Sequence, residues 1–205
     1  MDLMDLLKSQ IGEQAIGAMT SQLGGASPKA TSAGMDGAMS ILMSALAKNT
    51  KNEQGASALN SALDRDHDGS ILDDVVGFLN GTSQATNTRA ANGAGILGHL
   101  LGGQQGQAVE QLSKASGLDQ QQASSMLMKM APLVLGMLGK QKRNTNLGLN
   151  DLSGLLAGAA QTSRARVQGG DLLTSFLDQD GDGSIVDDAA KIGGSFLKNI
   201  FRRRR

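Results

Sequence analysis

The sequence contains no cysteine, no tryptophan and no tyrosine, and phenylalanine occurs only four times in 205 residues. The missing cysteines exclude disulfide bonds, thiolate metal sites and cysteine catalysis. The scarcity of aromatic rings leaves few side chains that can stack on nucleic-acid bases. Leu, Ile, Val and Phe together make up only about 22% of the chain, so a folded core must also use methionine and alanine.

The chain also lacks a long apolar run and the features of a secretory leader. The N-terminal MDLMDLLKSQIGEQ carries acids where a signal peptide carries basic residues. The longest apolar stretch, residues 130–138, is far shorter than the roughly 20 residues that span a bilayer. We therefore expect a soluble protein of the cytoplasm. No combination of Ser, His and acid indicates a catalytic centre, so we expect that the protein is not an enzyme.

Two short segments share an unusual pattern of acidic residues. LDRDHDGSILDDV, residues 63–75, returns as LDQDGDGSIVDDA, residues 177–189. Ten of the 19 acidic residues lie in these two segments, whereas the rest of the chain is mildly basic. Five carboxylates within eleven residues repel one another unless a cation lies among them. The pattern therefore favours a metal site in each segment.

The spacing is similar to that of an EF-hand calcium loop, which has oxygen ligands at positions 1, 3, 5, 7, 9 and 12 and glycine at position 6. Both segments depart from it, because positions 9 and 12 are aliphatic while positions 10 and 11 are acidic. We expect non-standard loops that bind calcium (Ca²⁺) in preference to Mg²⁺, because the ligands are many and all oxygen. The expected ligands are Asp64, Asp66, Asp68, Ser70, Asp73 and Asp74 in the first loop, and Asp178, Asp180, Asp182, Ser184, Asp187 and Asp188 in the second.

The same residues also fit a simpler interpretation, in which the segments are turns. Asp and Gly reverse the chain, and Ser70 with Asp73, or Ser184 with Asp187, can cap the following helix. The first hypothesis is thus a calcium-binding protein with two sites. The alternative is a metal-independent helical interaction or oligomerisation module, in which the loops only cap helices.

Helical patterns precede each Asp-rich segment. Ser27 followed by Pro28, and Asp119 followed three residues later by Gln122, are typical of helix N-termini. Apolar residues then recur at helical spacing, and the two helical stretches align at an offset of 92 residues. No segment shows the alternation of a β-strand. The predicted fold is all-α and internally duplicated, with each half ending in a helix, an Asp-rich loop and a helix.

The duplication predicts the domain organisation. A first helical repeat spans residues 1–80 with its loop at 64–74, and a linker spans residues 81–95. The second repeat spans residues 96–201, with an insertion and a loop at 178–188, and a basic tail follows at 202–205. Further loops are expected at 49–55 and 161–170. If the two Asp-rich loops lie together as in paired EF-hands, Ile71 and Ile185 pair between them.

Several other features have an ordinary structural interpretation. GAGILG, residues 93–98, fits G-x-G-x-x-G, but no strand precedes it and we interpret it as linker running into a helix. His67 and His99 lie far apart in sequence and are expected to be ordinary surface or core residues. Pro132 is expected to kink or restart its helix. The methionines expected in the core are Met126, Met128, Met130 and Met137.

The expected partners are a second copy of the chain or another protein, engaged through helical faces. The four arginines at 202–205 give only weak, salt-sensitive attachment to a polyanion, so we do not expect nucleic-acid or membrane binding. We expect no small-molecule substrate.

Four blocks of the sequence resemble a known bacterial family. The blocks are DLLKSQIGEQA, LDRDHDGSILDDVVGFLNG, GILGHLLGGQQGQAVEQLSKASGLDQQQASSMLMKMAPLVLGMLGKQ and LLTSFLDQDGDGSIVDDAAKIGGSFL. Together they are similar to the domain-of-unknown-function family numbered 937, which is related to the YidB-like proteins. The resemblance implies a bacterial, largely helical protein. It implies no established activity and no catalytic residues.

Overall fold

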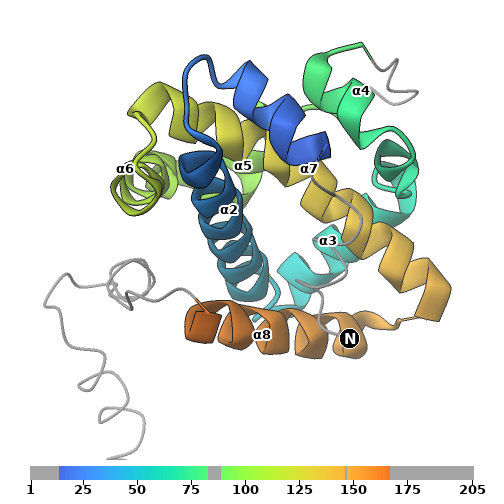
Figure 1. Ribbon diagram of the computed structural model, residues 1–205. Coiled ribbons are helices and arrows are strands. Elements are labelled where there is room, and N and C mark those ends of the chain that lie inside the picture. Colours follow the sequence, from blue (N-terminus) through green and yellow to red (C-terminus); the bar gives the residue numbers. More distant parts are fainter. Residues whose placement is uncertain (1–13, 83–88, 146, 167–205) are drawn as a thin grey trace, which may run out of the picture. The chain divides into compact units, whose positions relative to one another are not determined.

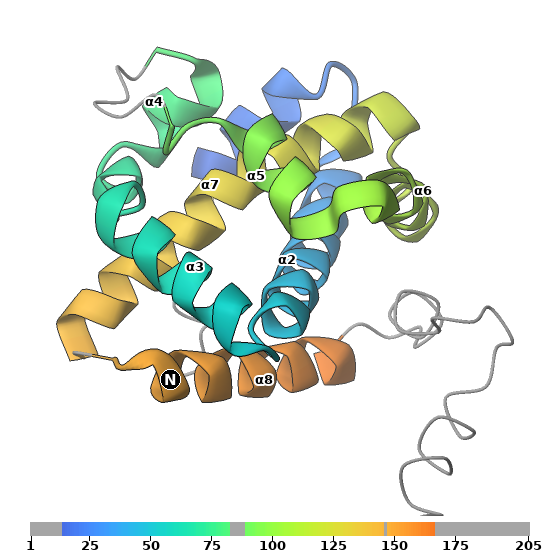
Figure 2. The ribbon, with the colours of Figure 1, turned by 180° about the vertical axis from the view of Figure 1, so that it is seen from behind.

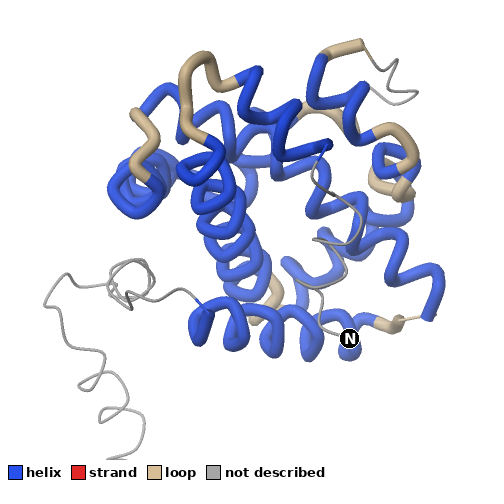
Figure 3. Tube along the Cα trace, in the orientation of Figure 1, coloured by secondary structure: helices blue, strands red, loops and turns tan. Residues whose placement is uncertain are grey.

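The structure is a computed structural model that describes residues 14–82, 89–145 and 147–166. The chain divides into two compact units, Met1–Gln168 and Gly169–Arg205, and all described residues belong to the first. These residues form helices, turns and loops and contain no strand, as Figure 3 shows, so the all-α prediction is confirmed for them. The second Asp-rich loop, Ile185 and the basic tail lie outside the described residues.

Figure 1 shows the helices of the first unit that the structure describes. Residues 14–22 are helical. They are followed by α2 (Pro28–Asn49), α3 (Glu53–Arg65), the short 3-10 helix η1 (Ser70–Leu72), α4 (Val75–Asn80), α5 (Gly93–Leu101), the 3-10 helix η2 (Gly102–Gln104), α6 (Gln105–Ser116), α7 (Gln120–Thr145) and α8 (Leu149–Arg166).

The two long helices α2 and α7 begin where the sequence predicts. The Ser27 hydroxyl accepts a hydrogen bond from the Ala30 amide at 3.1 Å, and Pro28 occupies the first turn of α2. At the start of α7, the Gln122 amide donates to Asp119 Oδ1 at 2.8 Å, and the Asp119 amide donates to Gln122 Oε1 at 3.0 Å. This reciprocal pair is a capping box. Both predicted helix starts are therefore confirmed.

The core lies around α2 and α7, which pack against each other and both against α5 and α6, while α8 packs on α2. Met126, Met130 and Met137 of α7 are at most 1% exposed, so their predicted place in the core is confirmed. Met128 is half-buried. Methionine and alanine supply much of the remaining core, as the low content of branched aliphatic residues requires.

Pro132 does not restart its helix, because α7 runs without a break from Gln120 to Thr145. A proline has no N–H, so the carbonyl of Met128, four residues earlier, loses its helical donor. Gly93 at the start of α5 lies against this carbonyl, and a Cβ at Gly93 would stand only 1.8 Å from the Met128 oxygen. A glycine therefore lets α5 approach α7 at the carbonyl that the proline leaves without a donor.

Three helices occupy parts of segments that were expected to be linker or loop. Helix α3 begins at Glu53, within the expected loop 49–55. The first turn of α5 begins at Gly93, within the expected linker 81–95. Residues 161–166, expected to form a loop, belong to α8, which packs on α2 and α3. Figure 2 shows α8 running across the ends of these two helices. The proposed boundaries of the two repeats stay a prediction.

Candidate functional site

The first Asp-rich segment connects α3 to α4. Helix α3 ends at Arg65, and Asp66 is its C-cap residue. Gly69 then adopts a φ of 89°, a left-handed conformation that favours glycine, and leads into η1. Asp74 begins α4, and its Oδ1 accepts a hydrogen bond from the Gly77 amide at 2.8 Å. The segment is therefore a helix–loop–helix connection, as predicted.

The Asp68 carboxylate accepts hydrogen bonds from Ser70, two residues later in the same turn. Its Oδ1 accepts hydrogen bonds from the Ser70 hydroxyl at 2.6 Å and from the Ser70 amide at 3.0 Å. The hydroxyl bond, followed by the amide bond, lowers the pKa of the Asp68 carboxyl, since both donors favour its charged form. The carboxylate therefore stabilises the turn around Gly69.

Two other acids of the segment pair with basic side chains. Asp64 Oδ1 accepts a hydrogen bond from Lys142 Nζ of α7, and Asp64 Oδ2 accepts one from Asn60 Nδ2 at 3.4 Å. Asp66 lies 3.7 Å from the guanidinium of Arg65. The acids are thus directed to different partners along the chain.

The arrangement of the first segment differs from a metal-binding loop. Within the described ranges, no three His, Asp or Glu side chains lie close enough together to hold a metal ion. The hydrogen bonds of Asp68 and Asp74 are those of helix-capping turns. The caps are not those expected from the sequence, because Asp74 caps α4 instead of the pair Ser70 and Asp73. Calcium binding itself stays a prediction for both loops.

The segment packs tightly onto α7. A Cβ on Gly139 would stand 1.7 Å from the His67 carbonyl oxygen, and a Cβ on Gly136 would stand 2.5 Å from Ile71 Cγ2. We call Gly136 and Gly139 the glycine notch of α7. Ile71 therefore packs into this notch, and its expected partner Ile185 lies outside the described residues. The close approach joins the end of α3 to α7.

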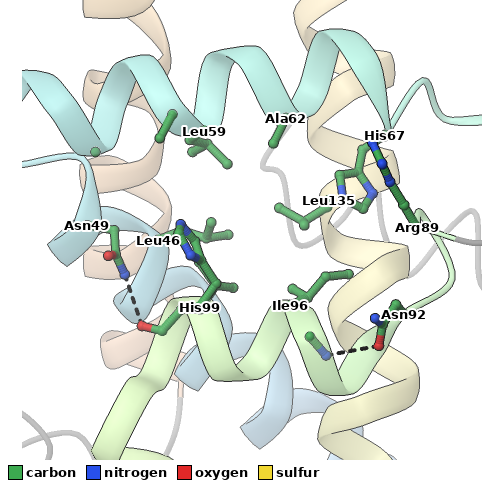
Figure 4. A pocket seen from close by; sticks show the side chains of 14 residues that line it. Leu46, Asn49, Leu59, Ala62, His67, Arg89, Asn92, Ile96, His99 and Leu135 are labelled. Carbon is green, nitrogen blue, oxygen red and sulfur yellow. Dashed lines mark hydrogen bonds between the residues drawn. The ribbon is translucent and has the colours of Figure 1, made fainter.

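A pocket of about 240 Å³ lies between α3 and α5 (Figure 4). Leu59 and Ala62 of α3 face Ile96 of α5 across it. Its other apolar wall side chains are those of Leu46, Ala58, Leu100 and Leu135. Among the described residues that line it, the titratable side chains are His67, His99 and Arg89, and none is Asp or Glu. The pocket therefore combines an apolar interior with basic and imidazole groups.

His67 is the most deeply buried polar residue of the pocket wall. His67 lies just after the end of α3 and is only 6% exposed. Its Nδ1 is buried and has no hydrogen-bond partner. Burial lowers the pKa of His67, and the neighbouring Asp66 and Asp68 partly offset this effect. The hydrogen bonding of the imidazole is thus not completed by the described residues.

Two asparagines make hydrogen bonds at the two ends of α5 beside the pocket. Asn92 Oδ1 accepts a hydrogen bond from the Gly95 amide at 3.0 Å and caps α5 (Figure 4). Asn49 Nδ2 donates to the Leu100 carbonyl at 3.0 Å and to the Ala45 carbonyl at 2.9 Å. The bond to the Leu100 carbonyl ties the end of α2 to the end of α5, whereas the Asn92 bond lies within the first turn of α5.

The pocket was not predicted from the sequence. His67 and His99 are 32 residues apart and were expected to be ordinary residues, yet both line the same pocket. No spacing rule links them, because the position of α5 depends on its contact with α7 at Gly93. The GAGILG segment was interpreted as linker running into a helix, and it lies wholly within α5, so the helix is confirmed and the linker part is wrong.

The fold and these sites define an all-helical domain with side-chain-capped helices and a pocket between two of them. The family model described as "Bacterial protein of unknown function (DUF937)" matches residues 5–141. The chain belongs to this family, and the resemblance seen in the sequence is confirmed. The matched residues include the first Asp-rich segment and end before the second.

The other comparisons add no relative. No curated protein and no solved structure matches the chain. Across the part of the chain that the structure describes, no helix has both the length and the apolar character needed to cross a membrane.

Proposed function

We propose that the chain is a non-enzymatic helical interaction module, in which the first Asp-rich loop is a metal-independent turn that fastens α3 to α7. The main observation behind this proposal is the close contact between the loop and the glycine notch. Gly139 faces the His67 carbonyl and Gly136 faces Ile71, so backbone and side chain both contact α7 directly.

The acids of the loop support the proposal, because they have partners within the protein. Asp68 binds Ser70, Asp74 caps α4, and Asp64 pairs with Lys142. Each of these contacts reduces the repulsion or the desolvation that a cation would otherwise have to offset. The loop therefore keeps its shape without a metal.

The proposed partners are other protein surfaces, with a second copy of the chain as the first candidate. A closely packed helical body presents fixed faces, and its many Gly, Ala and Met residues permit close and adaptable packing. Light scattering after size exclusion tests this, in chelator and in excess calcium. We expect a mass above the 21.1 kDa monomer that calcium does not change. A monomer at every concentration, or an oligomer that requires calcium, would contradict the proposal.

A second candidate function is calcium binding, which the repetition of the Asp pattern in both segments favours. In the first segment, Asp64 and Asp68 would exchange Lys142 and Ser70 for the cation. Calorimetric titration of metal-stripped protein with Ca²⁺, and with Mg²⁺ for comparison, tests this candidate. Two saturable Ca²⁺ sites, one lost in Asp66→Ala and the other in Asp180→Ala, would support it. Absence of heat and of any shift in melting temperature would rule it out.

A further inference from the structure

The pocket between α3 and α5 has the chemistry of a ligand site. Its walls are aliphatic, and the titratable groups that line it are Arg89, His67 and His99, without a carboxylate among the described lining residues. Ligand pockets typically combine mostly apolar walls with a few polar groups that orient the ligand. An anion with an apolar body matches both parts of this lining.

His67 supplies an independent sign that the pocket takes a polar ligand. The residue is 6% exposed, and its Nδ1 is buried without a hydrogen-bond partner. A buried polar atom without a partner is unfavourable, because the hydrogen bond that it made with water is not replaced. Rotation of the imidazole ring by 180° about the Cβ–Cγ bond exchanges the positions of Nδ1 and Cδ2, so Nδ1 can lie at either edge of the ring. A ligand oxygen in the pocket can then complete the hydrogen bonding of the imidazole.

The size of the pocket limits the ligand. A volume of about 240 Å³ lies below the range of about 300–1,000 Å³ that is usual for drug-sized molecules. The opposed side chains of Leu59 and Ile96 leave space for a short hydrocarbon chain or a single ring. Arg89 carries a permanent positive charge and presents a planar fork of donors that matches a carboxylate.

We propose that the pocket between α3 and α5 binds a small monocarboxylate, with its apolar body between Leu59 and Ile96 and its carboxylate directed to Arg89 and His67. This site uses none of the candidate metal ligands of the Asp-rich loops and does not depend on the proposed self-association. Because His67 also belongs to the loop that lies on α7, the loop positions one polar group of the pocket.

Titration of the full chain with benzoate, followed by amide chemical shifts in NMR spectra, tests the proposal. We expect saturable binding with the largest shifts at the amides of Leu59, Ile96 and His99. Two probes separate the contributions of charge and apolar body. Benzyl alcohol has the ring without the charge and inorganic phosphate has the charge without the ring, so each should bind at least tenfold more weakly.

Variants locate the site. Arg89→Gln removes an exposed charge at the pocket and should weaken benzoate binding about tenfold. Lys114→Gln removes one exposed charge on α6, away from the pocket, and should leave binding unchanged. Ile96→Trp fills the pocket and should abolish binding in protein that still shows a cooperative melting curve. If Ile96→Trp does not fold, the comparison of Arg89→Gln with Lys114→Gln decides the matter.

Three results would overturn the proposal. One is a folded wild-type chain that shows no saturable shifts with benzoate. Another is equal binding of benzoate and benzyl alcohol, or of benzoate and phosphate, since either shows that the pocket does not recognise an apolar carboxylate. The third is an equal loss of affinity in Arg89→Gln and Lys114→Gln, which would assign the effect to overall charge.

Discussion

Helix α3 meets the rest of the domain in two contrasting ways. At its C-terminal end, the loop that follows it lies so close to α7 that no Cβ fits at Gly139. Along its length, Leu59 and Ala62 stand apart from Ile96 of α5, and the pocket lies between them. The same helix is therefore held tightly at one end and bounds an open site along one side.

The contrast shows that the Asp-rich loop has a structural role for the pocket. His67 takes part in both regions, because its carbonyl faces Gly139 while its side chain lines the pocket. The close contact between the loop and α7 requires glycine in α7. Aliphatic side chains line the pocket and keep α3 and α5 apart. Changes in the loop are therefore expected to reach the pocket through His67.

The largest effect is expected from closing the glycine notch. Gly139→Ala raises helix propensity by about 1 kcal/mol. However, its Cβ would stand 1.7 Å from the backbone oxygen of His67, so the loop must move away. We expect a net loss of about 2 kcal/mol or more in the free energy of unfolding, measured by urea denaturation.

A matched control is Gly154→Ala in α8, where a Cβ meets nothing within 4 Å. This exposed helical position should gain about 1 kcal/mol. Equal stability changes in the two variants would mean that the loop does not pack into the notch as described.

A smaller effect is expected from the cap of α4. Asp74→Ala removes the acceptor of the Gly77 amide and should cost about 1 kcal/mol in the presence of chelator. Asp73→Ala changes an exposed neighbour that does not cap the helix, and should change stability by less than about 0.5 kcal/mol. Equal losses in the two variants would count against Asp74 as the structural cap.

The ion pair between the loop and α7 is expected to contribute less. Lys142→Met keeps an unbranched side chain but removes the charge that faces Asp64. Because the Asp64 side chain is 53% exposed, water screens the pair, and we expect a loss of about 0.5 kcal/mol at low salt. The difference from wild type should shrink in thermal melts at 1 M salt. A difference that salt leaves unchanged would show that packing, and not charge, is responsible.

His67 is expected to make stability depend on pH in the mildly acidic range. Burial lowers the pKa of His67 in the folded protein below its ordinary value of 6.5, so the unfolded chain binds the proton more readily. Stability from the neutral imidazole is complete above pH 6.5 and is lost as the pH falls from there toward the lower folded pKa. In chelator, wild type should therefore lose more stability than His67→Gln between about pH 7 and 5. Parallel curves for the two proteins would contradict this.

Local signals in the sequence predicted the all-α fold, the starts of α2 and α7 and the methionine core. Ser27, Asp119 and Gln122 act through hydrogen bonds to amides within three residues, so the sequence alone contains both partners. Pro132 was harder to place, because the carbonyl that it leaves without a helical donor lies against Gly93 of a different helix.

Among the candidate sites too, local features were predicted and contacts between distant residues were not. The Asp pattern predicted a turn between two helices, and η1 with α4 confirms it. The partners of the acids did not follow from the pattern, because Lys142 is 78 residues from Asp64. The pocket forms only when α3 and α5 are placed relative to α7. The residues next to His67 and His99 in the sequence do not indicate that placement.

The central claim is that the first Asp-rich loop forms and stays seated on α7 without metal. Amide hydrogen exchange at Leu72 and Gly77 tests it most directly, since the Leu72 amide donates to the Gly69 carbonyl and the Gly77 amide donates to Asp74. We predict slow exchange of both amides in chelator, unchanged by excess calcium. Rapid exchange in chelator that becomes slow on addition of calcium would contradict the account and make the loop a metal site.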